Sequence, residues 1–120
     1  MNGITVSQLR RLIPNVKIID IRDNYQYNLG SIPTAKNVPI NFLLTNTELY
    51  LNHYDTYYIY CEYGKTSSSA CRKLKAKGYS VIDIIGGYNE YKTLNWQIKS
   101  RERYYLFFID KVTLFKVKSG

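Results

Sequence analysis

A chain of 120 residues is long enough for one compact domain and too short for two ordinary ones. Its hydrophobic content of 45% is typical of a globular protein that buries a core. With 17 Lys and Arg against 9 Asp and Glu the formal net charge is +8, but the basic residues are dispersed, which favours small anions or acidic proteins over nucleic acid as partners.

The first third of the chain predicts a helix, a strand and a second helix. Thr5–Gln8 has the form of a capping box and begins a short helix that ends at Pro14. Val16–Ile21 is rich in β-branched residues and predicts a strand. Asp23 caps a second short helix at Asn24–Leu29.

The rest of the chain continues this alternation of short β-rich runs and helix signals. The predicted segments are a strand at 37–40, an irregular helical stretch at 41–52, strands at 56–60 and 80–85, and helices at 67–77 and 88–94. Strand, helix and strand joined by short links indicate an α/β fold with a parallel sheet and right-handed crossovers.

We predict that residues 1–100 form the domain and that the last segment is separate from it. Residues 101–120 are a basic, aromatic extension to which the sequence assigns no role, and runs at 104–109 and 112–117 predict two strands or an edge hairpin. If its aromatic side chains are exposed, we expect them to form a homodimer contact. Trp96, near the end of the domain, is predicted to fill the core.

Cellular location is read from the absence of targeting signals. Met1–Pro14 has no long apolar core, and the most apolar run, Tyr104–Ile109, is far shorter than the roughly 20 residues that a membrane span needs. Without an export signal, Cys61 and Cys71 are expected to stay reduced. We therefore expect a cytoplasmic protein that does not bind membranes.

The residues with the clearest chemistry follow the strand at 56–60. Cys61 stands between a predicted buried strand and a helix, where loop N–H groups and a helix N-terminus favour an anion and so stabilise a thiolate. Gly64 permits the tight loop, Lys65 adds a positive charge, and Thr66 and Ser67 offer hydroxyls that donate to sulfur or cap the helix. On spacing alone, a buried inert thiol explains Cys61 equally well.

Three blocks of the sequence together resemble the rhodanese-like domains. Asp20–Arg22 with Gly30–Pro39 is similar to their N-terminal signature, Tyr58–Ser67 to their active-site loop, and Gly86–Tyr91 to their closing Gly-Gly turn and aromatic helix. The blocks occur in the family's order and cover roughly residues 4–98. The resemblance implies a three-layer α/β/α fold around a mostly parallel sheet of about five strands.

The resemblance also implies a sulfurtransferase that carries sulfane sulfur as a persulfide on Cys61. The donor would be thiosulfate, another small anionic sulfur compound or a protein persulfide, and the acceptor would be cyanide or a thiol. Glu62, Tyr63, Gly64, Lys65, Thr66 and Ser67 would bind the substrate. Asp20 and Arg22 match positions that brace the fold near the loop. Neither a metal nor an organic cofactor is expected, and the lone histidine, His53, argues against a zinc site.

Two departures from the family pattern bear on the substrate. Many members carry Arg where this chain has Glu62 and Thr66, and a carboxylate beside the nucleophile disfavours an anionic donor. We therefore expect weak activity with thiosulfate and a persulfide as the donor. Two alternatives stay open: a non-catalytic binding module, and a cysteine-based phosphatase or arsenate reductase, which would need an arginine where Ser67 stands.

Overall fold

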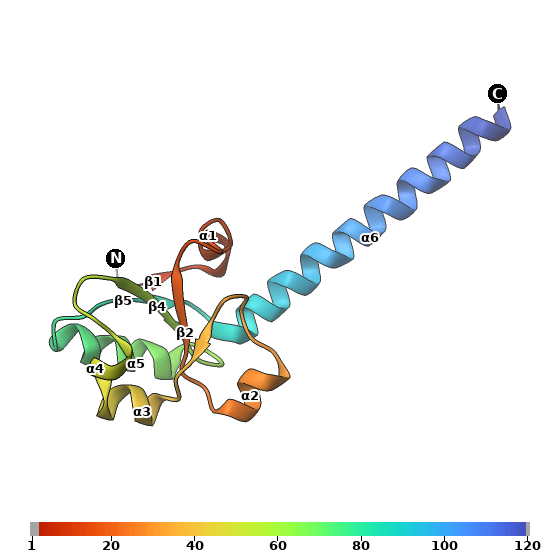
Figure 1. The fold of residues 1–120 in the computed structure, drawn as a ribbon. Coiled ribbons are helices and arrows are strands. Elements are labelled where there is room, and N and C mark those ends of the chain that lie inside the picture. The colour runs from red at the N-terminus through yellow and green to blue at the C-terminus, as the bar shows by residue number, and fades with distance from the viewer. Residues whose placement is uncertain (1–2, 120) are drawn as a thin grey trace.

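The computed structural model describes residues 3–119, with side chains described up to Arg103. Its centre is a sheet of five strands in which every pairing is parallel (Figure 1). The strands are β1 (Gly3–Ile4), β2 (Lys17–Asp20), β3 (Lys36–Asn37), β4 (Thr56–Tyr60) and β5 (Ser80–Ile84). They lie in the order β1-β5-β4-β2-β3, so β4 is the middle strand. The predicted α/β class with a parallel sheet is confirmed.

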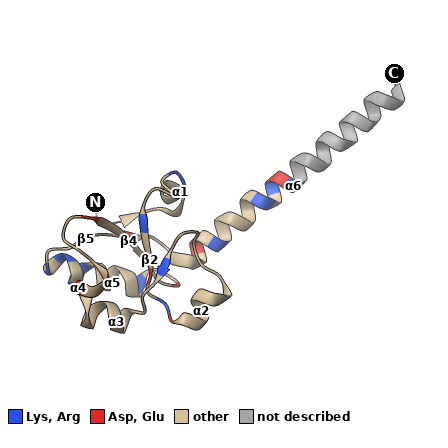
Figure 2. Ribbon diagram, in the orientation of Figure 1, with Lys and Arg blue, Asp and Glu red and all other residues tan. Residues whose placement is uncertain are grey.

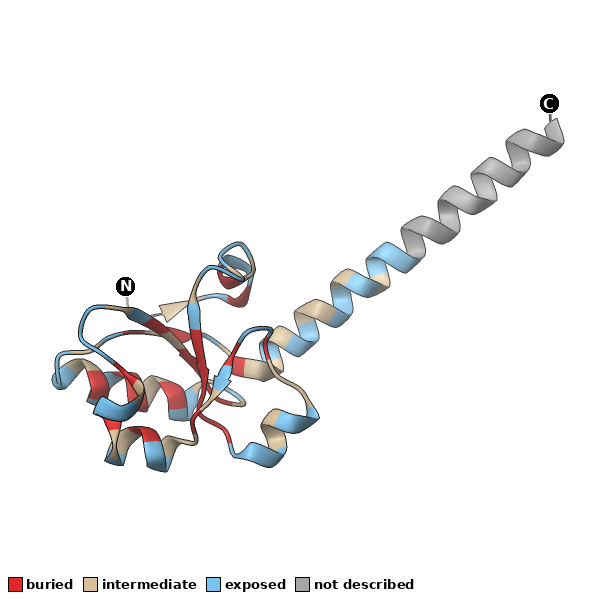
Figure 3. Cartoon of the chain, viewed as in Figure 1, coloured by how far each residue is buried: buried red, intermediate tan, exposed pale blue. Residues whose placement is uncertain are grey.

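Helices cover both faces of this sheet (Figure 1). They are α1 (Val6–Arg10), α2 (Asn24–Leu29), α3 (Ile40–Thr45), α4 (Thr47–Tyr50), α5 (Lys65–Ala76) and α6 (Gly87–Ser119). Side chains of α3, α4 and α5 pack in one apolar cluster, whereas α1, α2 and the start of α6 contribute to a second cluster on the other face. The domain therefore has three layers, and its buried residues follow the strands and the inward sides of the helices (Figure 3).

Strand β4 shows how the pattern of residues divides between the two faces. Tyr57 and Ile59 enter the cluster beneath α5, whereas Tyr58 and Tyr60 enter the opposite cluster. Successive side chains of a strand point to opposite faces, so the next residue, Cys61, lies on the α5 side. Because β4 is buried on both faces, it reads in the sequence as a continuous run of β-forming residues.

Several helix ends form as their cap residues predict. The backbone N–H of Gln8 donates to the Thr5 hydroxyl at 3.1 Å and that of Thr5 donates to the Gln8 side chain at 2.9 Å, which completes the capping box of α1. The Asp23 carboxylate accepts from the backbone N–H of Gln26 at 2.8 Å at the start of α2. After α5, Gly78 adopts a φ of +90°, the left-handed conformation that ends many helices.

Two expectations about the end of the chain are wrong. In place of strands at 104–109 and 112–117, α6 continues as one helix to Ser119 and extends away from the domain (Figure 1). Trp96, expected in the core, is 69% exposed because α6 has already left the sheet at this point. The proposed dimer contact through the tail aromatics lies outside the described side chains, and the division at residue 100 stays a prediction.

Two further expectations concern the distribution of basic residues and whether a helix could span a membrane. Basic residues of the described part are spread along the chain over α1, β2, β3, α5 and α6 (Figure 2). Across residues 3–119, α6 included, no helix combines the length and the apolar character needed to cross a lipid bilayer.

Candidate active site around Cys61

The loop between β4 and α5 holds Cys61 beneath the first turn of the helix. The turn depends on Gly64, which has a φ of +102° and would bring a Cβ within 3.0 Å of the backbone nitrogen of Gly86. Helix α5 begins at the next residue, Lys65, and is 12 residues long. Cys61 is only 7% exposed. The sequence thus folds locally to place one thiol against the positive end of a helix dipole.

Three hydrogen bonds meet at the sulfur of Cys61. The backbone N–H groups of Gly64 and Ser67 donate to Sγ at 3.1 and 3.2 Å. The Cys61 thiol in turn donates to the Ser67 hydroxyl oxygen at 3.3 Å. Two backbone donors at a helix N-terminus thus converge on one sulfur atom, the kind of arrangement that binds anions in proteins. The geometry agrees with the anion-favouring loop expected from the sequence.

The same loop is fixed from behind by the first turn of α6. The backbone N–H groups of Tyr88 and Asn89 donate to the carbonyl oxygens of Cys61 and Glu62, each at 2.9 Å. Gly87 lies so close that a Cβ there would be 2.3 Å from the Cys61 carbonyl oxygen. These contacts direct the carbonyl groups of Cys61 and Glu62 toward α6, while the N–H groups of Gly64 and Ser67 point at the sulfur.

An open cleft of about 400 Å³ lies in front of Cys61. Its lining residues are Ile21, Arg22, Gln26, Cys61, Glu62, Tyr63, Lys65 and Thr66. Tyr63 is 72% exposed at the mouth and gives the rim an aromatic surface. The cleft can admit a small molecule or an extended side chain of another protein to the sulfur.

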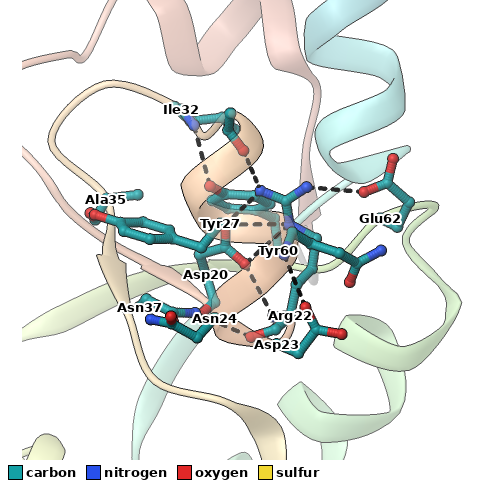
Figure 4. Close-up of polar contacts among 12 residues, drawn as sticks. Asp20, Arg22, Asp23, Asn24, Tyr27, Ile32, Ala35, Asn37, Tyr60 and Glu62 are labelled. Carbon is teal, nitrogen blue, oxygen red and sulfur yellow. Dashed lines mark hydrogen bonds and ion pairs between the residues drawn. The ribbon is translucent and has the colours of Figure 1, made fainter.

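A buried ion-pair network forms one wall of the cleft (Figure 4). Arg22 contacts Asp20 at 2.7 Å and Glu62 at 2.9 Å. It also donates to the Gly30 carbonyl at 2.6 Å. Burial by itself lowers the pKa of Arg22, but hydrogen bonds to Asp20 and Glu62 outweigh it and raise that pKa above its usual range. Since Lys92 lies 3.9 Å from Glu62, this carboxylate faces two cations, while Arg22 divides its charge between two carboxylates.

A polar pair lies behind the sulfur, between α5 and β5. The Ser67 hydroxyl donates to the carboxylate of Asp83 at 2.5 Å, and both side chains are buried. Burial raises the pKa of Asp83, although the hydrogen bond from Ser67 and the charge of Lys75 act in the opposite direction. Asp83 is not among the site residues predicted from the sequence. Its signal is one acidic residue within the mostly apolar strand β5.

The second cysteine, Cys71, is a core residue. Cys71 is 3% exposed and packs in the cluster beneath α5. Burial raises the pKa of its thiol to about 12, so it is neutral near pH 7. Both cysteines are free thiols. Within the described residues, His, Cys, Asp and Glu side chains form no group of three that could hold a metal ion.

The structure brings the predicted site residues together in and beside the cleft. Those that line it are Cys61, Glu62, Tyr63, Lys65 and Thr66, with Gly64 and Ser67 bound to the sulfur and Asp20 bound to the lining residue Arg22. Their roles in a reaction stay predictions. The Gly86–Tyr91 block is part of the family resemblance, but its hydrogen bonds to the loop are not predictable from the sequence.

Comparison with known proteins places this architecture in a family. The family model of the rhodanese-like domain matches residues 5–94, which include strands β2 to β5, the loop and the first turns of α6. The chain belongs to the rhodanese-like domain family. The resemblance read from three sequence blocks is therefore confirmed.

Individual members of this family are similar over most of the domain. A crystal structure of SSP1007 from Staphylococcus saprophyticus is 32% identical, with a TM-score of 0.70 over 76% of this chain and 93% of that one. A rhodanese-like domain protein of Staphylococcus aureus is 28% identical, with a TM-score of 0.70 over 76% and 91%. The adenylyltransferase and sulfurtransferase uba4 of Ogataea parapolymorpha is 31% identical over 75 residues, 62% of this chain but 19% of that protein. The chain thus spans about a fifth of that curated relative.

Proposed function

We propose that this rhodanese-like protein is a sulfurtransferase that accepts sulfane sulfur on Cys61 and passes it to a thiol. The observation that carries the proposal is the convergence of the Gly64 and Ser67 N–H groups on Sγ at the N-terminus of α5. The same groups can hold the negative charge of a persulfide, which has one sulfur more than the thiolate. The relationship to uba4, which is named a sulfurtransferase, supports the same reaction class.

The reaction needs no cofactor in this scheme. The Cys61 thiolate attacks the outer sulfur of a donor persulfide, R–S–S⁻, and a new S–S bond forms to Cys61. The S–S bond of the donor breaks, and its electron pair leaves with R–S⁻. An acceptor thiolate then attacks the outer sulfur of the Cys61 persulfide, which releases the Cys61 thiolate for another cycle. Cyanide can take the place of this acceptor, and thiosulfate can take the place of the donor with sulfite as the leaving group.

The charges of the cleft favour a persulfide over thiosulfate as the donor. Arg22 is shared by Asp20 and Glu62, so little of its charge is available to a dianion. Lys65, exposed at the start of α5, is a cation at the mouth that can meet a donor carrying one negative charge. A small-molecule or protein persulfide therefore suits this cleft better than thiosulfate does.

Mass spectrometry of the intact protein tests the proposal directly. The reduced protein is incubated with a low-molecular-weight persulfide and, separately, with thiosulfate. We expect a gain of one sulfur atom with the persulfide donor, no gain in Cys61→Ser, and loss of the added sulfur when a thiol acceptor follows. Failure of both donors to load the protein would overturn the proposal and leave a non-catalytic binding module as the better interpretation.

A series at Glu62 tests the choice of donor. For a donor charge about 10 Å away and an effective dielectric constant of about 20, each unit of charge changes the interaction by about 1.7 kcal/mol, or at least tenfold. Thiosulfate turnover should therefore rise from the parent to Glu62→Gln and again to Glu62→Arg, whereas loading by a neutral polysulfide should change little. Equal thiosulfate turnover in all three proteins would refute the electrostatic argument.

A phosphatase or arsenate reductase has less support. That chemistry needs a guanidinium six residues after the cysteine, where this chain has Ser67 with its hydroxyl directed at Asp83. We expect no turnover of p-nitrophenyl phosphate.

A further inference from the structure

The Ser67 hydroxyl lies between two groups that can each hold a proton. On one side the Cys61 thiol donates to Ser67 Oγ at 3.3 Å, and on the other Ser67 Oγ donates to Asp83 Oδ1 at 2.5 Å. A weaker alternative acceptor for the same hydroxyl is the Gly64 carbonyl at 3.2 Å. Ser67 is fully buried, and Cys61 and Asp83 are each less than a tenth exposed. The three side chains therefore form a continuous hydrogen-bonded row through the domain interior.

A serine hydroxyl has a single proton, so Ser67 can donate only one hydrogen bond at a time within the row. While Asp83 is a carboxylate, the Ser67 proton is directed at it, and only oxygen lone pairs face the sulfur. That arrangement fits the neutral Cys61 thiol, which supplies the proton of its own hydrogen bond. A Cys61 thiolate accepts hydrogen bonds from the backbone N–H groups of Gly64 and Ser67. It can gain the Ser67 hydroxyl as a third donor, without Asp83 losing its hydrogen bond to Ser67, when Asp83 carries a proton and donates it to Ser67 Oγ.

We propose that Asp83 is a positioning residue that takes up the thiol proton of Cys61 through the Ser67 hydroxyl, so that the nucleophile and the acid share one proton. The proposal rests on the proposed function, because it describes how the thiolate of that reaction forms. In the transfer, the S–H bond breaks as a new O–H bond forms to Ser67, and the former Ser67 proton passes to Asp83. The products are a Cys61 thiolate and a neutral Asp83 carboxyl group, and the net charge of the row does not change.

The surroundings of Asp83 suit a proton acceptor. Burial raises the pKa of its carboxyl group above the ordinary value, although the hydrogen bond from Ser67 and the charge of Lys75 act in the opposite direction. Behind it lies a second cleft of about 280 Å³, lined by Ser68, Cys71, Arg72, Lys75 and Asp83. Because this cleft shares no lining residue with the substrate cleft, Asp83 can exchange its proton with water there without passing the substrate.

The other charged groups near Cys61, Ser67 and Asp83 either form an ion pair with each other or line one of the two clefts. Cys71 faces Asp83 as a neutral thiol, while Arg72 and Lys75 are the cations of the second cleft. On the other side Cys61 faces the substrate cleft with Arg22, Glu62, Lys65 and the phenol of Tyr63. Arg22 and Glu62 form an ion pair there, so Asp83 is the carboxylate joined to the sulfur through Ser67.

The test is the pH dependence of Cys61 alkylation by iodoacetamide, read on the Cys61 peptide by mass spectrometry. Two groups that share a proton titrate in two macroscopic steps, so the alkylation rate of the parent should rise twice with increasing pH. Asp83→Asn should lose the lower step and show a single rise. Asp55→Asn, which alters an exposed acid paired with Lys17, is the matched control and should keep both steps.

Infrared spectroscopy of the parent provides a second measurement that does not depend on a variant of Asp83. The carboxylic acid band of a buried group should disappear over the same two steps, and in Cys61→Ala over one. A single rise of the alkylation rate with pH in the parent, or two rises that persist in Asp83→Asn, would overturn the proposal that Cys61 and Asp83 share a proton. Neither readout uses a sulfur donor, so failure of sulfur loading with two-step alkylation would reject the proposed function alone.

Discussion

The contact between Gly87 and the active-site loop gives the sharpest stability prediction. In Gly87→Ala, the new Cβ would lie 2.3 Å from the Cys61 carbonyl oxygen, about 1 Å closer than an ordinary contact of 3.4 Å, and the residue has a φ of +62°. A left-handed alanine costs about 1–2 kcal/mol. Weakening the two hydrogen bonds that Tyr88 and Asn89 donate to the loop adds about 0.5–1.5 kcal/mol each. We expect the free energy of unfolding to fall by about 2–5 kcal/mol in total.

The same substitution should impair sulfur loading, because it displaces the loop that holds the sulfur. A shift of about 1 Å at a reacting group can lower a rate by about 10²-fold. Gly78→Ala is the matched control: Gly78 has a φ of +90°, but the nearest atoms to its Cβ are 3.7 Å away. The free energy of unfolding of Gly78→Ala should fall only by the conformational cost of a left-handed alanine, and this variant should load sulfur at the parent rate. Urea denaturation and a loading time course measure both quantities, and equal losses with equal loading rates in the two variants would refute the steric argument.

Three further predictions concern buried groups. Arg22→Met should lower the free energy of unfolding by about 3–5 kcal/mol in urea titrations, because it leaves Asp20 buried without its cation; a loss below about 1 kcal/mol would contradict this. Asp83→Asn should raise the melting temperature near pH 8, because a carboxyl group with a raised pKa in the folded state destabilises the fold as it ionises. The pH-dependent part of the difference from the parent should disappear below about pH 3, where this group is protonated in both the folded and the unfolded state, and a difference that does not vary with pH would exclude this cause. Finally, iodoacetamide at pH 8 should label Cys61 and leave Cys71, whose pKa is about 12, unlabelled until the protein unfolds; equal labelling in peptide mapping would reject the buried assignment.

Elements fixed by local chemistry could be predicted from the sequence to within a residue. Helix α2 has the expected bounds because Asp23 supplies the cap and Gly30 follows its last turn. Strand β4 has the expected bounds because a run of β-forming residues ends abruptly at Cys61. The loop geometry at the sulfur also agrees with expectation, since a cysteine between a strand and a helix has few other places to lie.

Features set by distant partners were not predictable in this way. The two-residue strand β1 exists only because Gly3 and Ile4 pair with β5, and no local signal marks it. The β-forming side chains of residues 104–109 predict a strand, but the helix that begins at Gly87 continues through them. Intrinsic propensity is a weak predictor, and extending an existing helix by one residue is easier than starting a new element. The link from Ser67 to Asp83 joins residues on different elements and needs the crossover geometry to be seen.

The strand order has a consequence for how the protein is made on the ribosome. Strand β5 lies between β4 and β1, so the N-terminal strand cannot join the sheet until the chain has been synthesised beyond residue 84. Asp83 and the N–H groups of Tyr88 and Asn89 also emerge only then. A nascent chain therefore carries the Cys61 thiol for some time before its supporting contacts exist. Until those contacts form, the Cys61 thiol is not yet buried, and exposure is one of the two conditions on which oxidation of a thiol depends.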